Sequence, residues 1–215
     1  MPFITISRMY GSGGSDVAER VATVLGWTLF DNLMIDRIAE RSGLSRAEVK
    51  AQDERVPSMV ERLAAALSMG SPEIMPPVPI GPMETTEERV VAVTRRVIEE
   101  AVHAGPAVFV GRGAQSLLAE RTDALHVFCF APKPALLQYE MRKSNVDEAE
   151  AERRVSDINK QREQYVKRHW NRHWMALENY HLCVNTSWLG IEGAANQVLD
   201  AVRRQFGLIN LPPTS

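Results

Sequence analysis

Residues 3–22 read Phe3-Ile-Thr-Ile-Ser-Arg-Met-Tyr-Gly-Ser-Gly-Gly-Ser-Asp-Val-Ala-Glu-Arg-Val-Ala22 and combine the signals of a strand, a turn and a helix. The β-branched run at 4–6 is typical of a central strand, and the apolar residues after residue 16 recur at helical spacing. Between them, Gly11, Gly13 and Gly14 let the backbone turn tightly. This order predicts a phosphate cradle, in which backbone N–H groups of the turn and of the helix N-terminus point at an anion.

The cradle departs from the usual phosphate-binding pattern, G-x-x-x-x-G-K-[ST], because Arg8 stands at its first glycine and Gly14 at its lysine. Glycine carries no charge, so we expect Arg8 or a cation from elsewhere to meet the phosphates, since a planar guanidinium suits phosphate. The hydroxyls of Ser12 and Ser15 are candidate phosphate ligands, and Ser15 is also a candidate for Mg²⁺. Asp16 either stabilises the helix N-terminus or holds Mg²⁺ between itself and a phosphate.

The composition is that of a soluble globular protein, with 215 residues, 45% hydrophobic, 24% charged and a formal charge of −2. We expect a single domain over residues 1–215, because this length can bury one full core. The small net charge argues against general nucleic-acid binding, and no apolar run approaches the roughly 20 residues that span a bilayer. We therefore expect a cytoplasmic protein without nucleic-acid or membrane partners, and leave a homodimer open.

Four further short apolar runs are predicted to be strands, and helical stretches separate them. The predicted strands after the first cover residues 27–30, 107–110, 125–130 and 182–185. The first predicted helix ends near residue 25. The others cover about 32–41, 90–104, 134–143, 147–170 and 191–206. Because parallel neighbours need crossover connections, this alternation predicts a doubly wound α/β fold with five parallel strands.

The two cysteines, Cys129 and Cys183, both fall within predicted strands of apolar residues. Buried reduced thiols are the usual state of such cysteines, so we expect neither a disulfide nor a cysteine metal site. Cysteine chemistry is therefore not expected to carry the function.

Four stretches, taken together and in their order along the chain, resemble the cytidylate kinase-like family of P-loop proteins. The stretches are 4–14, 110–113, 159–165 and 182–187. The resemblance implies a P-loop NTPase-like three-layer α/β/α fold with a helical insert of nucleoside-monophosphate-binding type at about 43–85 and a helical lid at about 155–175. It also implies ATP and Mg²⁺ as cofactors and transfer of the γ-phosphoryl group of ATP to CMP, dCMP or a related monophosphate.

The same resemblance implies roles for residues that would bind the acceptor nucleotide. Asp31 and Arg37 match the Asp and Arg of a stretch that lies at the monophosphate site. Arg112 lies in a Gly-Arg-Gly turn that resembles the Gly-Arg-Asp motif of the acceptor site, with Gly113 at the place of the Asp.

Cations in the implied lid are the candidate catalytic residues, together with Arg8. Arg162 and Arg168 resemble the lid cations of the family and lie in a stretch that is rich in Lys and Arg. Phosphoryl transfer needs neutralisation of the charge on the β- and γ-phosphates, which arginines supply well. A solvated helix face is the alternative interpretation of this basic stretch.

Two other functions remain open from the sequence. A non-catalytic relative that binds a nucleotide or another phosphate ligand would explain the missing lysine. An NAD(P)-dependent oxidoreductase is the second alternative, because Gly11-Ser-Gly13 begins G-x-G-x-x-G and Asp31 follows at about the 20-residue offset of a ribose-binding acid. Asp16 in place of the third glycine counts against it, since a carboxylate there would repel a pyrophosphate.

Overall fold

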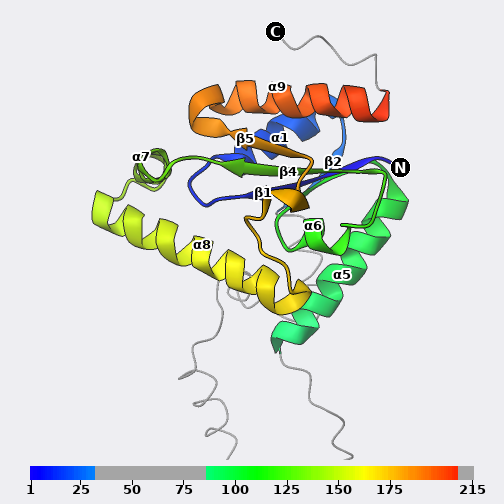
Figure 1. Ribbon diagram of the computed structural model, residues 1–215, viewed down its shortest axis with the longest axis horizontal. Helices are drawn as coiled ribbons and strands as arrows, with labels where there is room; N and C mark the ends of the chain where they lie inside the picture. The colour runs from blue at the N-terminus through cyan, green and yellow to red at the C-terminus, as the bar shows by residue number, and fades with distance from the viewer. Residues whose placement is uncertain (32–85, 208–215) are drawn as a thin grey trace, which may run out of the picture.

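The computed structural model of the chain describes residues 1–31 and 86–207. These residues form a five-stranded, fully parallel sheet with helices on both of its faces (Figure 1). The strands are β1 (Phe3–Arg8), β2 (Thr28–Phe30), β3 (Ala107–Val110), β4 (Ala124–Phe130) and β5 (Leu182–Asn185), in the spatial order β2-β3-β1-β4-β5. The predicted α/β fold with five parallel strands is thus confirmed.

Helices follow the strands as the crossover connections require. They are α1 (Gly14–Leu25), α5 (Thr86–Ala104), α6 (Ala114–Leu117), α7 (Lys133–Ser144), α8 (Glu148–Trp170), the short 3₁₀ helix η1 (Leu177–Asn179) and α9 (Thr186–Phe206). The structure differs from the sequence prediction in α9, which begins at Thr186 and bends at Gly190, where φ is 70°. The predicted helix 32–41, the insert 43–85 and Arg37 lie outside the described residues.

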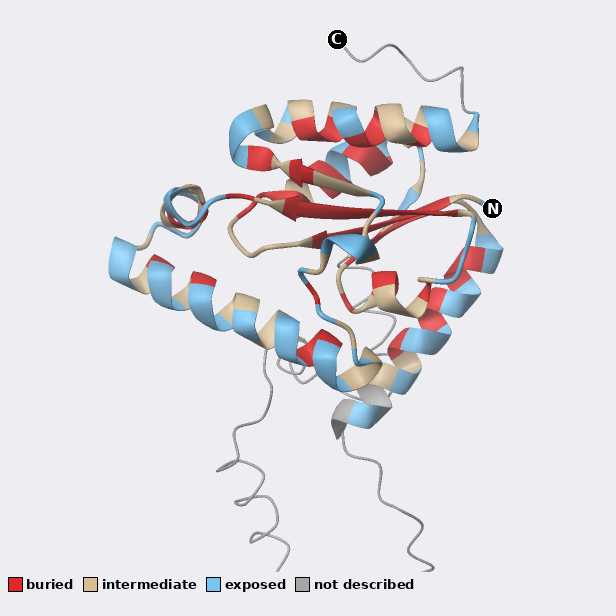
Figure 2. Ribbon diagram, viewed as in Figure 1, coloured by how far each residue is buried: buried red, intermediate tan, exposed pale blue. Residues whose placement is uncertain are grey.

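Two apolar layers bury the sheet, one on each face (Figures 1 and 2). Alternate side chains of a strand point to opposite faces, so Ile4 and Ile6 of β1 pack with α1 and α9, while Phe3 packs with α5. Phe3 and Phe109 meet edge to face at 6.1 Å between ring centroids. Burial on both faces explains why these strands are continuous apolar runs rather than alternating ones.

The strands that flank β1 distinguish this fold from a dinucleotide-binding one. The order 3-2-1-4-5-6 of dinucleotide-binding sheets places strand 2 beside strand 1. Here β3 and β4 flank β1, with Ile6 opposite Val110 and Arg8 opposite Cys129. This order counts against the oxidoreductase alternative, and the parallel register brings the loops after β1, β3 and β4 to one edge.

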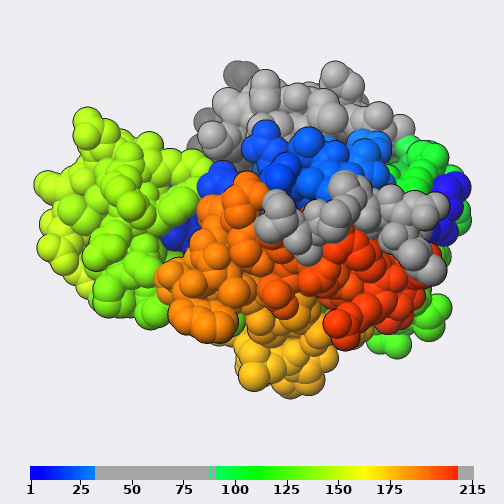
Figure 3. Space-filling model, turned by 90° about the horizontal axis from the view of Figure 1, so that it is seen from above, coloured from blue at the N-terminus to red at the C-terminus, as the bar shows by residue number. Residues whose placement is uncertain are grey.

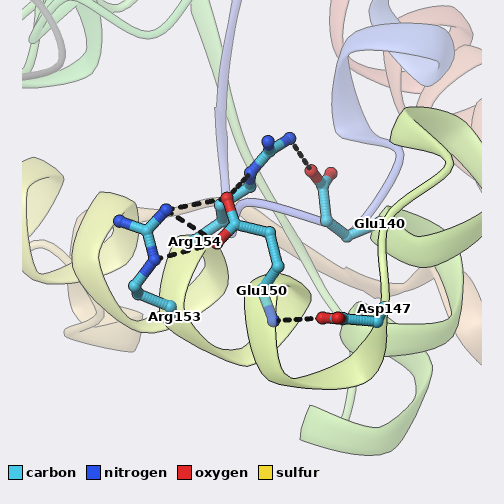
Figure 4. Close-up of polar contacts among 5 residues, drawn as sticks. All are labelled: Glu140, Asp147, Glu150, Arg153 and Arg154. Carbon is cyan, nitrogen blue, oxygen red and sulfur yellow. Dashed lines mark hydrogen bonds and ion pairs between the residues drawn. The ribbon is translucent and has the colours of Figure 1, made fainter.

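The corner between α7 and α8 is fixed by a polar network (Figure 4). Asp147 caps α8 by accepting from the backbone N–H of Glu150 at 2.8 Å, and the Glu150 carboxylate accepts from Arg153 and Arg154. Arg154 also reaches Glu140 of α7 at 3.3 Å. The exposed ion pair between Arg153 and Glu150 contributes only about 0–1 kcal/mol, and apolar packing also stabilises this corner. Its buried apolar residues are Ala131, Leu136, Leu137, Ala151 and Val155.

Both cysteines are free thiols; Cys129 is buried in β4, as predicted, whereas Cys183 is only half-buried in β5. Burial raises the pKa of the Cys129 thiol to about 12, so it stays protonated at neutral pH. In the two described ranges, no helix combines the length and apolar character that a bilayer crossing needs.

His126 makes the stability of the fold depend on pH. Its side chain is only 2% exposed, its Nδ1 lies 2.7 Å from the Thr5 hydroxyl, and its ring stacks on His181. Burial, together with the charge of His181, lowers the pKa of His126 to about 4, whereas an unfolded histidine titrates near 6.5. Between these values the unfolded chain binds more protons, so we expect the free energy of unfolding to fall as the pH drops from about 6.5 to 4, by as much as about 3 kcal/mol.

Urea unfolding at a series of pH values measures this effect. The variant His126→Gln is expected to flatten the profile in that window, and the exposed His103 provides the control variant His103→Gln. A wild-type profile that is flat between pH 4 and 6.5 would contradict the assignment of a neutral buried histidine.

Candidate functional site

The turn after β1 has the strand–turn–helix geometry that the sequence predicts. Gly11 and Gly13 adopt left-handed φ values of 80° and 70°, which glycine tolerates and other residues rarely adopt. The Ser12 hydroxyl and backbone N–H donate to the carbonyl of Met9 at 2.8 and 3.2 Å, which closes the turn. Gly13 then caps α1 without a side-chain hydrogen bond. The backbone therefore presents the N-terminus of a 12-residue helix to the edge of the sheet.

Gly14 has no room for a side chain. A Cβ placed there would lie 2.6 Å from Cβ of Arg8 and 2.9 Å from Cβ of Cys129, closer than Cβ atoms approach in proteins. Both neighbouring atoms are attached directly to strand backbone, so neither can move aside without shifting β1 or β4. The first turn of α1 thus packs so tightly on the sheet that a lysine at position 14 is sterically excluded.

Arg8 extends from the end of β1 across the turn that follows β3. Its Nε donates to the Ser15 hydroxyl at 3.3 Å, and its Nη1 passes over Gly111, where a Cβ would lie only 2.2 Å away. Ser15 directly follows Gly14, at the spacing of the hydroxyl in the phosphate-binding pattern. The charge of Arg8 therefore lies between the glycine turn and the β3 turn.

A first cavity opens beside the β3 turn and is rich in positive charge. Arg8, Arg112 and Arg162 line it, and Arg112 is only 7% exposed. Its other lining residues are Ser7, Gly111, Gly113, Gln115, Ser116, Tyr165, Val166, Trp174 and Tyr180. Three arginines and no carboxylate line this cavity within the described part of the chain, which favours an anionic ligand.

The α8 helix explains the glycine at position 113. A Cβ at this position would lie 2.2 Å from Cη2 of Trp170, so the indole ring fills the space that a side chain would need. Gly113 also has a left-handed φ of 69°. An acidic side chain at position 113 would therefore require the indole of Trp170 to move.

A second cavity surrounds the glycine turn. It is lined by Gly11, Gly13, Gly14 and Ser15 of the turn, by Arg8, Arg162 and Lys143, and by Met9, Tyr10, Tyr139, Glu140 and Ser144. Arg8 and Arg162 line both cavities. Arg162 donates from Nη1 to the carbonyl of Arg8 at 2.9 Å, and its guanidinium lies 5.6 Å from the ring centroid of Tyr10. Two of the three candidate catalytic arginines, Arg8 and Arg162, thus lie together where the cavities meet.

The other candidate residues lie elsewhere. Arg168 is exposed on α8 and lines neither cavity. Asp31 is half-buried directly after β2 and likewise lines neither cavity, while Arg37 falls in the range that the structure does not describe. The roles given to Asp31, Arg37 and Arg168 stay predictions.

Two residues of α7, Tyr139 and Lys143, line the second cavity although no motif in the sequence marks them. The Tyr139 hydroxyl donates to Asp16, and Lys143 Nζ donates to Asp16 Oδ1 at 3.1 Å and to the Tyr139 oxygen at 2.8 Å. Burial, followed by the hydrogen bond to Asp16, raises the pKa of Tyr139, so it remains a donor. The spacing of Tyr139 and Lys143 by one helical turn is visible in the sequence, but nothing there links α7 to Asp16.

These contacts also fix the surroundings of Asp16. Its carboxylate points to α7 instead of capping α1, and α7 lies beside the N-terminus of α1 (Figure 3). Within the described ranges, no group of three His, Cys, Asp or Glu side chains could hold a metal. A Mg²⁺ bound here would therefore take most of its ligands from phosphates and water, as this ion commonly does, with Ser15 and Asp16 as the candidate protein ligands.

Comparisons with known proteins bear on the family and the fold of the chain. The model of the cytidylate kinase-like family matches residues 3–188. No curated protein sequence matches the chain.

Several solved structures share the fold. An uncharacterised protein from Eubacterium ventriosum is 18% identical, with a TM-score of 0.67 over 94% of this chain and 98% of that chain. TT1252 from Thermus thermophilus is 17% identical, with a TM-score of 0.52 over 95% of this chain and 97% of that chain. Shikimate kinase from Bacteroides thetaiotaomicron is 13% identical, with a TM-score of 0.52 over 94% of this chain and 98% of that chain. At these identities the likeness concerns the fold alone, which is the three-layer fold of P-loop NTPases.

Proposed function

The chain belongs to the cytidylate kinase-like family, and from this premise we propose that it transfers the γ-phosphoryl group of ATP to CMP, dCMP or a related nucleoside monophosphate. The observation that carries the proposal is the junction of the two cavities at Arg8 and Arg162. The cavity around the glycine turn suits the donor phosphates, and the cavity around Arg112 suits an anionic acceptor. A phosphoryl group that passes between them would cross the two arginines.

This arrangement supplies what phosphoryl transfer requires. An acceptor phosphate oxygen forms a bond to the γ-phosphorus while the bond from this phosphorus to the β–γ bridging oxygen breaks, and ADP leaves. Little covalent chemistry falls to the protein, so catalysis consists of alignment and charge neutralisation. Arg8 and Arg162 would neutralise the transferred group, and bound Mg²⁺ would add positive charge at the β- and γ-phosphates.

A non-catalytic phosphate-binding protein is the second candidate function. The packing around Gly14 favours it, because this position cannot hold the lysine of active P-loop enzymes. Such a protein would bind ATP or another phosphate ligand without turnover.

Turnover of purified protein decides between the two functions. ADP release is measured with ATP, Mg²⁺ and each common monophosphate, and we expect the highest kcat/KM with CMP or dCMP. Calorimetry with ATP accompanies the assay. ATP binding without turnover of any monophosphate would contradict the kinase and support the phosphate-binding protein.

Arg112→Ala tests the assignment of the acceptor cavity. Because Arg112 lines only the first of the two cavities, we expect the substitution to raise KM for the acceptor about tenfold, which is the effect of losing one charged hydrogen bond. KM for ATP is expected to stay unchanged. Arg121→Ala is the matched control, since Arg121 is exposed and binds Asp123 before β4. An equal rise of both KM values would contradict the division into a donor and an acceptor cavity.

A further inference from the structure

The phosphate cradle has to obtain a positive charge from outside its own loop. A P-loop lysine ordinarily reaches the β- and γ-phosphates of the donor. The clash at position 14 excludes such a side chain, because Cβ of Arg8 and Cβ of Cys129 occupy its space. The cations that line the cradle are instead Arg8, Arg162 and Lys143.

Lys143 reaches the cradle because α7 forms one of its walls. A Cβ on Gly11 would lie 2.7 Å from the carbonyl oxygen of Leu136, and one on Gly13 would lie 3.3 Å from Cε2 of Tyr139. Leu136, Tyr139 and Lys143 recur at the spacing of one helix face, so the face that contacts the glycine turn continues to Lys143. The close approach of both glycines to α7 fixes the distance of this helix from the turn.

The ammonium group of Lys143 is held in place before any ligand binds. It donates to Asp16 Oδ1 at 3.1 Å and to the Tyr139 oxygen at 2.8 Å, and Tyr139 in turn donates to Asp16. A lysine ammonium has three donors, so this closed arrangement uses two of them and leaves one for a phosphate oxygen. Lys143 also remains cationic, because its hydrogen bonds to Tyr139 and Asp16 raise its pKa more than burial lowers it.

The carboxylate of Glu140, which also lines the cradle, does not compete for this lysine. Glu140 is 2% exposed, and its carboxylate faces Arg154 of α8 at 3.3 Å (Figure 4). The carboxylate of Glu140 is thus paired with Arg154 and not with Lys143. Arg162 donates a hydrogen bond to the carbonyl of Arg8, so the positive charge on the side of the cradle formed by α7 comes from Lys143.

We propose that Lys143 replaces the P-loop lysine and donates to an oxygen of the β- or γ-phosphate of the donor, with Asp16 and Tyr139 as the residues that position it. The proposal rests on the proposed function, in that the donor is taken to be a nucleoside triphosphate. The charge then comes from the last turn of α7 instead of the first turn of α1.

Binding of inorganic tripolyphosphate and of MgATP to the full chain tests the proposal, measured by calorimetry. Lys143→Met is expected to weaken the binding of both ligands about tenfold, which is the effect of losing one charge-assisted hydrogen bond. Lys143→Arg should keep most of the affinity, because it retains the charge. Lys133→Met is the matched control on the same helix, since Lys133 pairs with Glu152 in an exposed contact and does not line the cradle.

Tyr139→Phe removes only the hydroxyl that positions Lys143. We expect it to raise KM for ATP several-fold while KM for the acceptor stays unchanged, a separation that general loss of stability would not produce. Thermal unfolding of each variant accompanies the measurements, and the half-exposed Lys143 side chain makes loss of the fold an unexpected result.

Two outcomes would overturn the proposal, and they can be told apart. If Lys143→Met binds tripolyphosphate and ATP as the wild type does while the wild type transfers phosphate, the role of Lys143 is wrong and the proposed function stands. If the wild type binds neither ligand, the proposed function fails as well.

Discussion

Replacing Arg162 by alanine is expected to lower kcat by roughly three orders of magnitude, the lower end of the effect of an arginine at a transferred phosphoryl group. Arg162 lies where the two cavities meet, and its Nη1 donates to the carbonyl of Arg8 at 2.9 Å. Its charge would therefore act on the group that passes between donor and acceptor. An interaction made mainly in the transition state lowers kcat more than it raises KM.

The measurement is steady-state release of ADP with ATP and the best acceptor. Arg153→Ala is the control on the same helix, because Arg153 is exposed and binds Glu150 at the other end of α8 (Figure 4). Circular dichroism melting of both variants separates loss of activity from loss of fold. A value of kcat for Arg162→Ala within threefold of the wild type would contradict the assigned role.

Replacing Gly14 by alanine is expected to destabilise the protein by about 1–3 kcal/mol, the usual cost of inserting a methyl group into a packed core. Gly14 begins α1, and alanine ordinarily stabilises a helix by about 1 kcal/mol relative to glycine. Here the added Cβ would meet Cβ of Arg8 at 2.6 Å and Cβ of Cys129 at 2.9 Å, so steric overlap outweighs the helix propensity. The same contact predicts that Gly14→Lys, which introduces the lysine of the usual motif, impairs folding.

Gly193→Ala in α9 is the matched control. A Cβ there would lie 3.4 Å from Cβ of Leu189, an ordinary contact, so this variant is expected to stabilise the protein by about 0.5–1 kcal/mol. Urea unfolding of both variants gives the free energies. Stabilisation by both alanines would show that the first turn of α1 has space that the structure does not show.

The strands were the part of the fold most accessible from the sequence. The strands at 107–110 and 182–185 were predicted to the residue, because each is a short apolar run between residues that break or cap structure. The long helix α8 was predicted to begin at Asp147, and the carboxylate of this residue caps its first turn. Such signals are local, since a cap and a run of apolar residues lie within one segment.

The start of α9 was harder to predict. The Asn185 side chain accepts from the N–H of Ser187 at 3.1 Å and begins the helix at Thr186, before the apolar periodicity becomes visible. The bend at Gly190 interrupts that periodicity, so the sequence pattern indicated only the part of the helix that follows Ile191.

The site was predictable where a residue belongs to a motif, and not where a tertiary contact assembles it. The glycine turn and Arg8 are contiguous in sequence, but Lys143 enters the site only because α7 packs against Gly11 and Gly13. Periodicity shows which face of a helix is apolar, yet it does not show against which segment that face packs. The contact between Asp16 and Lys143 therefore could not be predicted from the sequence.

The contact between Gly113 and Trp170 couples two positions that are distant in the sequence. A side chain at 113 would occupy the space of the indole, so it needs the indole to move or a smaller residue at 170. We therefore expect an acidic residue at 113 to be tolerated better together with a smaller residue at 170 than alone. The effects of the two substitutions on stability are then non-additive, which makes this pair of positions epistatic.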